Sequence, residues 1–202
     1  AGTDAGDIHV NADISYSQNK LTLNADNDIN LNAEINVNGT GTLALNHGNT
    51  GATGLKVSGQ VNFEQVGNGL LAVNGAGYTV IKDVAALQAI NNSDKSGHYA
   101  LGGDVDASDF GNFTPIGGNF GDVFEGVFDG LGHSISGLMI NSNLVGVGLF
   151  GRIENAVLRN VTLVGGSVIG QAGATAVGAL VGGSLVWEAD AGIFNVSAST
   201  AV

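Results

Sequence analysis

An eight-residue pattern near the start of the chain returns twenty-one positions later, and this repeat limits what the chain can fold into. Residues 7–14 read DIHVNADI and residues 28–35 read DINLNAEI, so apolar side chains fall at the same places with polar ones between them. An apolar residue at every second position is typical of a short strand with one buried face. Strands that repeat with a period near twenty bury that face by stacking on the next unit, as in a solenoid.

The same alternation continues through residues 7–82, interrupted by turn clusters rich in Asn, Asp and Gly. Because these turns return the chain every few residues, they predict rungs of two or three short strands rather than a flat meander. Stacked rungs place equivalent asparagines above one another, so Asn11 with Asn32 and Asn24 with Asn46 are predicted to form side-chain amide ladders. A polar binding stripe on the outside of the coil is the functional alternative, whereas turn formation is the ordinary role of Asn.

Residues 83–93 break the alternation and predict a short helix. Asp83 is a suitable N-cap. Either Val84, Leu87 and Ile90, or Ala86 and Ile90, fall on one helical face. We expect a helix of about two to three turns that packs against an open edge or side of the coil.

Aromatic residues gather in the irregular stretch that follows the helix. The residues concerned are Phe110, Phe113, Phe120 and Phe124, together with Pro115, the sole proline of the chain. Aromatic side chains bury a large area, so this cluster is expected to plug the coil where its cross-section changes.

Three regions follow from these patterns, and together they predict an all-β fold with one short helix. Residues 1–82 form Asn-rich rungs, residues 83–127 a helix and aromatic-rich connecting segment, and residues 128–202 further rungs with a period of about thirty. Because the alternation is still running at residues 193–198, we expect the rungs to continue beyond this fragment. The expected architecture is one elongated parallel β-helix, or two β-helical segments joined through residues 83–127.

Composition excludes several classes of partner and cofactor. Eighteen acidic and six basic residues give a net charge of −12, and without a cluster of Lys and Arg we expect no nucleic-acid partner. No run of about eighteen apolar residues is present, which predicts no membrane insertion. The chain contains no cysteine, so disulfides and thiolate metal sites are excluded, and no cofactor-binding motif is found.

Four short segments of the second half resemble the repeats of a known class of surface protein. They are residues 128–138 (FDGLGHSISGL), 148–153 (GLFGRI), 160–163 (NVTL) and 178–182 (GALVG), which resemble the GLUG-type repeats of large bacterial surface proteins. The Asn-rich first part, with runs such as NLNA and LTLN, resembles the rod of filamentous-haemagglutinin-like exoproteins secreted by the two-partner route.

This resemblance implies a right-handed parallel β-helix on the outside of a Gram-negative cell, exported with the help of an outer-membrane secretion partner. It implies a structural role in adhesion between cells, to a biofilm matrix or to a host surface, with a polysaccharide or a host receptor as the partner. The N-terminal secretion domain of such exoproteins is not visible here, so the export route is inferred for the parent protein. These repeats carry no catalytic residues by pattern, so the resemblance predicts that the chain is not an enzyme.

Polysaccharide-cleaving enzymes also use β-helices, so the acidic residues of the second part are considered as candidate catalytic residues. The candidates are Asp104, Asp106, Asp109, Asp122, Glu125 and Asp129, with His133 four residues after Asp129. A hydrolase places two carboxylates across a sugar bond, but acidic turn residues are far commoner, and the ordinary interpretation of residues 129–133 is a glycine-rich turn with an exposed histidine. A self-assembling fibre subunit that associates end to end through its open coil ends is the other alternative.

Two further features suggest ligands. Asp104, Asp106 and Asp109 place three carboxylates within six residues and are a candidate calcium site, although a solvated acidic loop is the ordinary interpretation because the spacing follows neither an EF-hand nor a calcium-binding nonapeptide. Trp187, the sole tryptophan, is a candidate sugar platform, although packing within a rung or at an edge is the commoner role.

Overall fold

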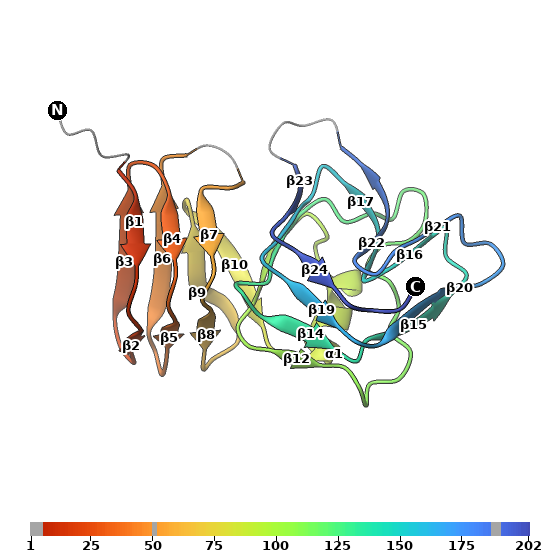
Figure 1. Ribbon diagram of the computed structural model, residues 1–202, viewed down its shortest axis with the longest axis horizontal. Coiled ribbons are helices and arrows are strands. Elements are labelled where there is room, and N and C mark those ends of the chain that lie inside the picture. Colours follow the sequence, from red (N-terminus) through yellow and green to blue (C-terminus); the bar gives the residue numbers. More distant parts are fainter. Residues whose placement is uncertain (1–5, 50–51, 187–190) are drawn as a thin grey trace.

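The computed structural model describes residues 6–49, 52–186 and 191–202. Its regular structure is almost entirely β, arranged as two groups of stacked strands that lie end to end along the longest axis of the molecule (Figure 1). The prediction of an all-β fold with one short helix is therefore confirmed.

The first nine strands make up the first stack, residues 8–73. They are β1 Ile8–Val10, β2 Ile14–Tyr16, β3 Lys20–Ala25, β4 Ile29–Leu31, β5 Ile35–Val37, β6 Thr42–His47, β7 Leu55–Val57, β8 Val61–Phe63 and β9 Gly67–Val73. Each turn of the chain adds one strand to each of three parallel arrays, in the orders β1-β4-β7, β2-β5-β8 and β3-β6-β9. Ile8 pairs with Ile29 and Ile14 with Ile35, so the repeat of twenty-one residues is confirmed as the stacking period of the first two rungs. The next rung follows at a spacing of 26 residues, since Ile29 pairs with Leu55.

Side-chain amides of successive rungs bond to one another along the outside of the first stack. Asn32 Nδ2 donates to Asn11 Oδ1 and Asn46 Nδ2 donates to Asn24 Oδ1, both at 2.8 Å. The two predicted amide ladders are confirmed. Because these amides satisfy each other between rungs, they contribute to the stacking itself.

A hairpin ends the first stack and reverses the direction of the strands. β9 pairs with β10 (Ala76–Ile81) in antiparallel fashion, around Asn74 and Gly75 with φ of 49° and 80°. Positive φ at both central residues is what a two-residue hairpin turn requires, and Asn followed by Gly supplies it. The eight-stranded sheet β23-β18-β13-β11-β10-β9-β6-β3 is consequently mixed, so the expectation of parallel pairing throughout is wrong at this hairpin.

The second stack contains the strands from β10 onward. After β10 they are β11 His98–Leu101, β12 Val105–Asp106, β13 Val127–Asp129, β14 Ser134–Ser136, β15 Met139–Ser142, β16 Gly146–Val147, β17 Phe150–Glu154, β18 Val157–Arg159, β19 Thr162–Val164, β20 Ser167–Gly170, β21 Ala176–Val177, β22 Val181–Leu185, β23 Gly192–Phe194 and β24 Ser197–Ala198. Their pairings with one another are parallel, for example β11-β13-β18-β23 and β12-β14-β19-β24. His98 pairs with Val127 and Val127 with Val157, close to the predicted period of about thirty.

The predicted helix is present between β10 and β11. It consists of α1 (Val84–Ala89) and a 3-10 helix (Ile90–Asn92), and Asp83 Oδ1 accepts a hydrogen bond from Ala86 N at 2.7 Å as the N-cap. Leu87 and Ile90 are buried in the core of the second stack, so the predicted apolar face is confirmed. In the described part of the chain, no helix combines the length and the apolar character needed to span a membrane.

Removing this cap gives a direct test of the helix. We expect Asp83→Ala to lower the free energy of unfolding by about 1 kcal/mol, because Ala86 N loses its acceptor. Urea unfolding followed by circular dichroism measures the change. Asp109→Ala, at another exposed aspartate, is the matched control and is expected to stay within about 0.5 kcal/mol of the native chain; an equal loss in both variants would contradict the assigned cap.

The core of the second stack is built around phenylalanine rings. Phe150 lies between Phe124 and Phe128, with ring centroids 4.8 and 5.3 Å away. Phe113 and Phe124 are fully buried, which confirms the predicted plug for two of its four members. Aromatic packing of this kind buries a large apolar area inside the second stack.

The other two members of the predicted plug are on the surface. Phe110 is 37% exposed and Phe120 is 77% exposed, so the prediction is wrong for both. Phe120 sits in a turn closed by a bridge between Asn119 and Asp122, and its ring lies 4.6 Å from the guanidinium carbon of Arg152. The turn directs the Phe120 ring outward, so the ring packs against the Arg152 guanidinium and not against the core.

Candidate functional site at the junction of the two stacks

The second stack covers the last rung of the first stack, and this contact is here called the junction. Val61 N in β8 donates to Leu131 O at 3.1 Å, and β9 is covered by β10. The outer edge of β7 instead faces a cleft, across which Asn195 Nδ2 donates to Val57 O at 3.2 Å. Two of the three arrays of the first stack are thus closed by the second stack, and the third opens into the cleft.

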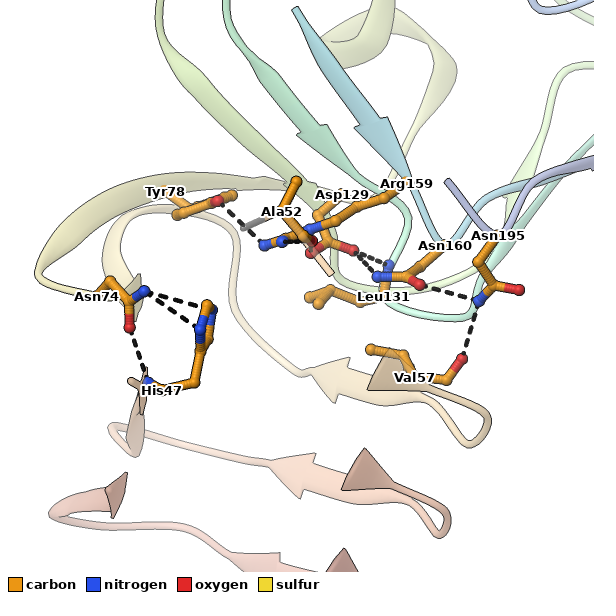
Figure 2. Close-up of polar contacts among 10 residues, drawn as sticks. All are labelled: His47, Ala52, Val57, Asn74, Tyr78, Asp129, Leu131, Arg159, Asn160 and Asn195. Carbon is orange, nitrogen blue, oxygen red and sulfur yellow. Dashed lines mark hydrogen bonds and ion pairs between the residues drawn. The ribbon is translucent and has the colours of Figure 1, made fainter. Parts of the chain in front are cut away.

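A buried ion pair lies beside this cleft (Figure 2). Arg159 Nε donates to Asp129 Oδ2 at 2.7 Å, and the two side chains are 5% and 0% exposed. The other guanidinium nitrogens donate to Ala52 O at 2.7 Å and to the Tyr78 hydroxyl at 3.5 Å. One arginine side chain therefore connects the β6–β7 loop, β10 and β13.

The surroundings keep both Arg159 and Tyr78 protonated. Burial acts to lower the pKa of Arg159, but the Asp129 carboxylate and the Tyr78 hydroxyl together outweigh it and raise that pKa above its ordinary value. Burial raises the pKa of Tyr78 to about 12. Arg159 therefore stays charged and Tyr78 stays neutral near neutral pH.

Two asparagines extend the network from rung to rung. Asn160 and Asn195 follow β18 and β23 and adopt positive φ, 55° and 49°, a conformation that Asn tolerates better than most residues. Asn160 Nδ2 donates to Asp129 Oδ1 at 3.0 Å, and Asn195 Nδ2 donates to Asn160 Oδ1 at 2.9 Å. The ladder starts at the buried carboxylate and ends at the side of the cleft (Figure 2).

His133 is buried at the junction and not exposed, which corrects the sequence-based expectation. Gly132, with φ of 87°, packs so closely on Gly59 O that a Cβ would lie 2.1 Å from it, and this contact brings the turn against the first stack. His133 Nε2 lies 2.9 Å from Val61 O and donates to it, since a carbonyl oxygen only accepts. His133 Nδ1 lies 3.5 Å from Asp104 Oδ1 and has no hydrogen-bond partner among the described residues.

The cleft has a volume of about 540 Å³ and lies between the β6–β7 loop with β7 on one side and the ends of β18 and β23 on the other. Its described lining is Ala52, Thr53, Leu55, Lys56, Val57, Ser58, Arg159, Asn160, Ile193, Phe194 and Asn195. A smaller hollow of about 290 Å³ adjoins it and shares Val57, Ser58, Asn160 and Asn195. The lining combines apolar side chains, amides, hydroxyls and two cations.

Lys56 is the more accessible of these two cations. Its side chain is 54% exposed, and its ammonium group donates to Asp28, which is buried. Hydrogen bonds from Lys56 and then from Asn49 lower the pKa of Asp28. The carboxylate partner therefore stays ionised behind the lining, while more than half of the Lys56 side chain is exposed.

The three aspartates of the candidate calcium site have separate roles. Asp104 Oδ1 accepts from Ser134 N at 2.8 Å. Burial acts to raise the pKa of Asp104, but the hydrogen bonds from Ser134 and, after them, the proximity of His133 lower it. Asp106 Oδ1 accepts from Ser108 N at 2.9 Å, and Asp109 is exposed. Within the described ranges, no group of three or more His, Cys, Asp or Glu side chains could hold a metal ion.

Removing calcium with a chelator tests whether these three aspartates bind calcium together. We expect the melting temperature to be unchanged when calcium is added or removed with a chelator, because Asp104 and Asp106 each bond a backbone N–H close to them. Differential scanning calorimetry at matched ionic strength measures it. A rise in melting temperature with calcium that Asp106→Asn abolishes would contradict this expectation.

The remaining acidic candidates do not form a pair across a cleft. Asp122 forms an ion pair with Lys95 at 3.0 Å, Glu125 is exposed, and Asp129 is engaged by Arg159. Asp129 Oδ1 also accepts from Leu131 N at 3.0 Å, so its oxygens are occupied in holding the junction. The candidate sugar platform Trp187 lies outside the described residues.

Sequence reasoning missed Lys56, Arg159 and Asn195 as junction residues. A signal was present for Arg159, which is one of only two arginines and follows buried positions of an alternating strand. An arginine at such a position requires a buried partner. No local pattern distinguishes Lys56 or Asn195 from other surface residues.

These observations define an all-β protein made of two stacks of parallel strands with a polar junction between them. Part of the chain is similar to halomucin from the archaeon Haloquadratum walsbyi (strain DSM 16790 / HBSQ001), with 43% identity over 104 residues. The match covers 45% of this chain and 1% of halomucin, which is therefore a very much longer protein. No family model matches the chain, and no solved structure matches it.

Proposed function

We propose that this chain is a structural stalk segment of a large secreted surface protein that attaches cells to one another, to a matrix or to a host surface. The observation that carries the proposal is the parallel, in-register stacking of rungs in both stacks. Each added rung extends such a stack by about 4.8 Å without requiring a larger core. Repeated rungs therefore make a long rod, which can hold a binding region far from the cell surface.

The proposed architecture is a right-handed parallel β-helix in two segments. Parallel pairing within each stack supports it, as do the amide ladders that link Asn11 to Asn32 and Asn24 to Asn46. The antiparallel hairpin β9–β10 is the place where one segment gives way to the other. The three sequence regions 1–82, 83–127 and 128–202 remain the proposed units of organisation.

The proposed location is extracellular. Similarity to 1% of a very much longer protein supports a chain that is one piece of a large parent, and the net charge of −12 favours solubility outside the cell. Attachment to a Gram-negative surface through an outer-membrane secretion partner rests on the GLUG-type and filamentous-haemagglutinin-like repeats alone. The proposed partner is a surface or matrix polysaccharide or a host receptor, and no catalytic role, cofactor, nucleic acid or membrane insertion is part of the proposal.

Replacement of this region in the parent protein tests the stalk role. Cells that secrete the parent without these residues are expected to lose attachment while the amount of secreted protein stays unchanged. A second strain carries an unrelated rod of the same length in place of the region. Attachment that survives the deletion would refute the proposal, whereas recovery with the unrelated rod would show that reach is what the segment supplies.

A further inference from the structure

We propose that the cleft at the junction, together with the adjoining hollow, binds a short stretch of an acidic saccharide. The cleft and the hollow share Val57, Ser58, Asn160 and Asn195, so they form one elongated groove. The cleft volume of about 540 Å³ lies within the range of about 300–1,000 Å³ that is usual for small-molecule sites. This inference rests on the proposed attachment role and gives that role a ligand.

The charges around the groove select for an anionic ligand. The chain has only six basic residues, yet two of them, Lys56 and Arg159, line the cleft, and no Asp or Glu is among its described lining residues. Their carboxylate partners Asp28 and Asp129 are 6% and 0% exposed and are therefore hidden from a ligand. Lys56 is therefore the one well-exposed charged side chain among the described lining residues.

Lys56 is the residue that recognises the ligand carboxylate. Its ammonium group has three N–H donors, and the contact with Asp28 uses one of them. Because the side chain is 54% exposed, the remaining donors are available to a ligand. A charge-assisted hydrogen bond to a sugar carboxylate is stronger than a bond to a neutral hydroxyl.

The rest of the groove matches the two kinds of surface on a sugar ring. Ile193 and Phe194 provide apolar surface for the C–H face, and Ile193 is 43% exposed. The hollow adds the hydroxyls of Thr162 and Ser197, which suit the hydroxyl groups of a following ring. Apolar packing in one part and hydrogen bonding in the other suits a linear chain of sugars.

The contacts at β7 favour a saccharide over a peptide strand. A peptide that extended this sheet would need Val57 O as an acceptor, but that oxygen already accepts from Asn195 Nδ2 at 3.2 Å. A nucleic acid would need several exposed cations for its phosphates, whereas of the two cations that line the cleft Arg159 is 5% exposed and Lys56 alone is well exposed.

Calorimetric titration of the whole chain with two probes tests the site. The probes are an oligomer of galacturonic acid and a neutral glucose oligomer of the same length. Lys56→Gln is expected to weaken binding of the acidic oligomer by about tenfold or more, because one charge-assisted contact is lost. Lys20→Gln removes the same charge from an exposed position on β3 and is expected to leave the affinity unchanged.

A second variant keeps the test decisive if Lys56→Gln perturbs folding. Ser58 is exposed where the cleft and the hollow meet, so Ser58→Tyr is expected to fill the groove and abolish binding, with the melting temperature as the check on folding. Equal affinity for the neutral oligomer, equal losses in both lysine variants, or no binding by the native chain would overturn the proposal. The stalk role would survive such a result, because replacement by an unrelated rod measures reach without any ligand.

Discussion

Replacing Arg159 by methionine is expected to lower the free energy of unfolding by about 3–5 kcal/mol, because Asp129 would remain buried without its cation. The same change removes the bonds to Ala52 O and to the Tyr78 hydroxyl, so three elements of the junction lose a shared partner. Urea unfolding measures the loss.

Two control variants distinguish the cost of leaving a buried charge unpaired from the cost of losing an arginine side chain. Arg152→Met changes the other arginine, which lies over the exposed ring of Phe120, and is expected to cost about 1 kcal/mol or less. Asp129→Asn combined with Arg159→Met removes both charges and keeps an oxygen for Leu131 N and Asn160 Nδ2. Urea unfolding should find the double variant more stable than Arg159→Met alone, and a double variant that is less stable would show that the unpaired carboxylate is not the cause.

Replacing Phe150 by alanine is expected to lower the free energy of unfolding by about 3–5 kcal/mol, since a fully buried ring would leave a cavity. Phe150 is 0% exposed, and the cavity would lie between Phe124 and Phe128 in the core of the second stack. Those two rings come from different rungs, so the gap would weaken the stacking of rungs as well as the packing within one. Thermal and urea unfolding measure the loss.

Phe120→Ala is the matched control for this prediction. Phe120 is 77% exposed, so its removal is expected to cost about 1 kcal/mol or less, chiefly through the contact with Arg152. Similar losses at Phe120 and Phe150 would contradict the assigned core. The pair therefore tests which of the clustered phenylalanines support the stack.

Much of the local structure could be predicted from residue patterns. Period-two alternation predicts strands because successive side chains point to opposite faces, and the repeat of twenty-one residues predicts the pairing of Ile8 with Ile29. Asp83 identifies the helix start because its side chain can accept a bond from Ala86 N. These features depend on residues that are close in sequence or equivalent between neighbouring rungs.

Local spacing was less informative about where polar side chains point. Asp104, Asp106 and Asp109 lie close in sequence, but Asp104 bonds Ser134 in the next rung and Asp106 bonds Ser108. His133 was expected to be exposed, yet the second stack presses it against Val61 O. At Asp104 and at His133, a contact from another rung or another stack outweighs the local preference.

By itself, the amino-acid sequence determined that this chain forms short strands in stacked rungs, because repeated alternation allows each rung to bury its apolar face only against the next. The tertiary structure alone decided how the two stacks meet. Asn195 bonds Val57 across 138 positions, and Arg159 bonds Ala52 across 107. Such contacts depend on where the hairpin at Asn74 and Gly75 directs the second stack, and no periodicity within either stack encodes that direction.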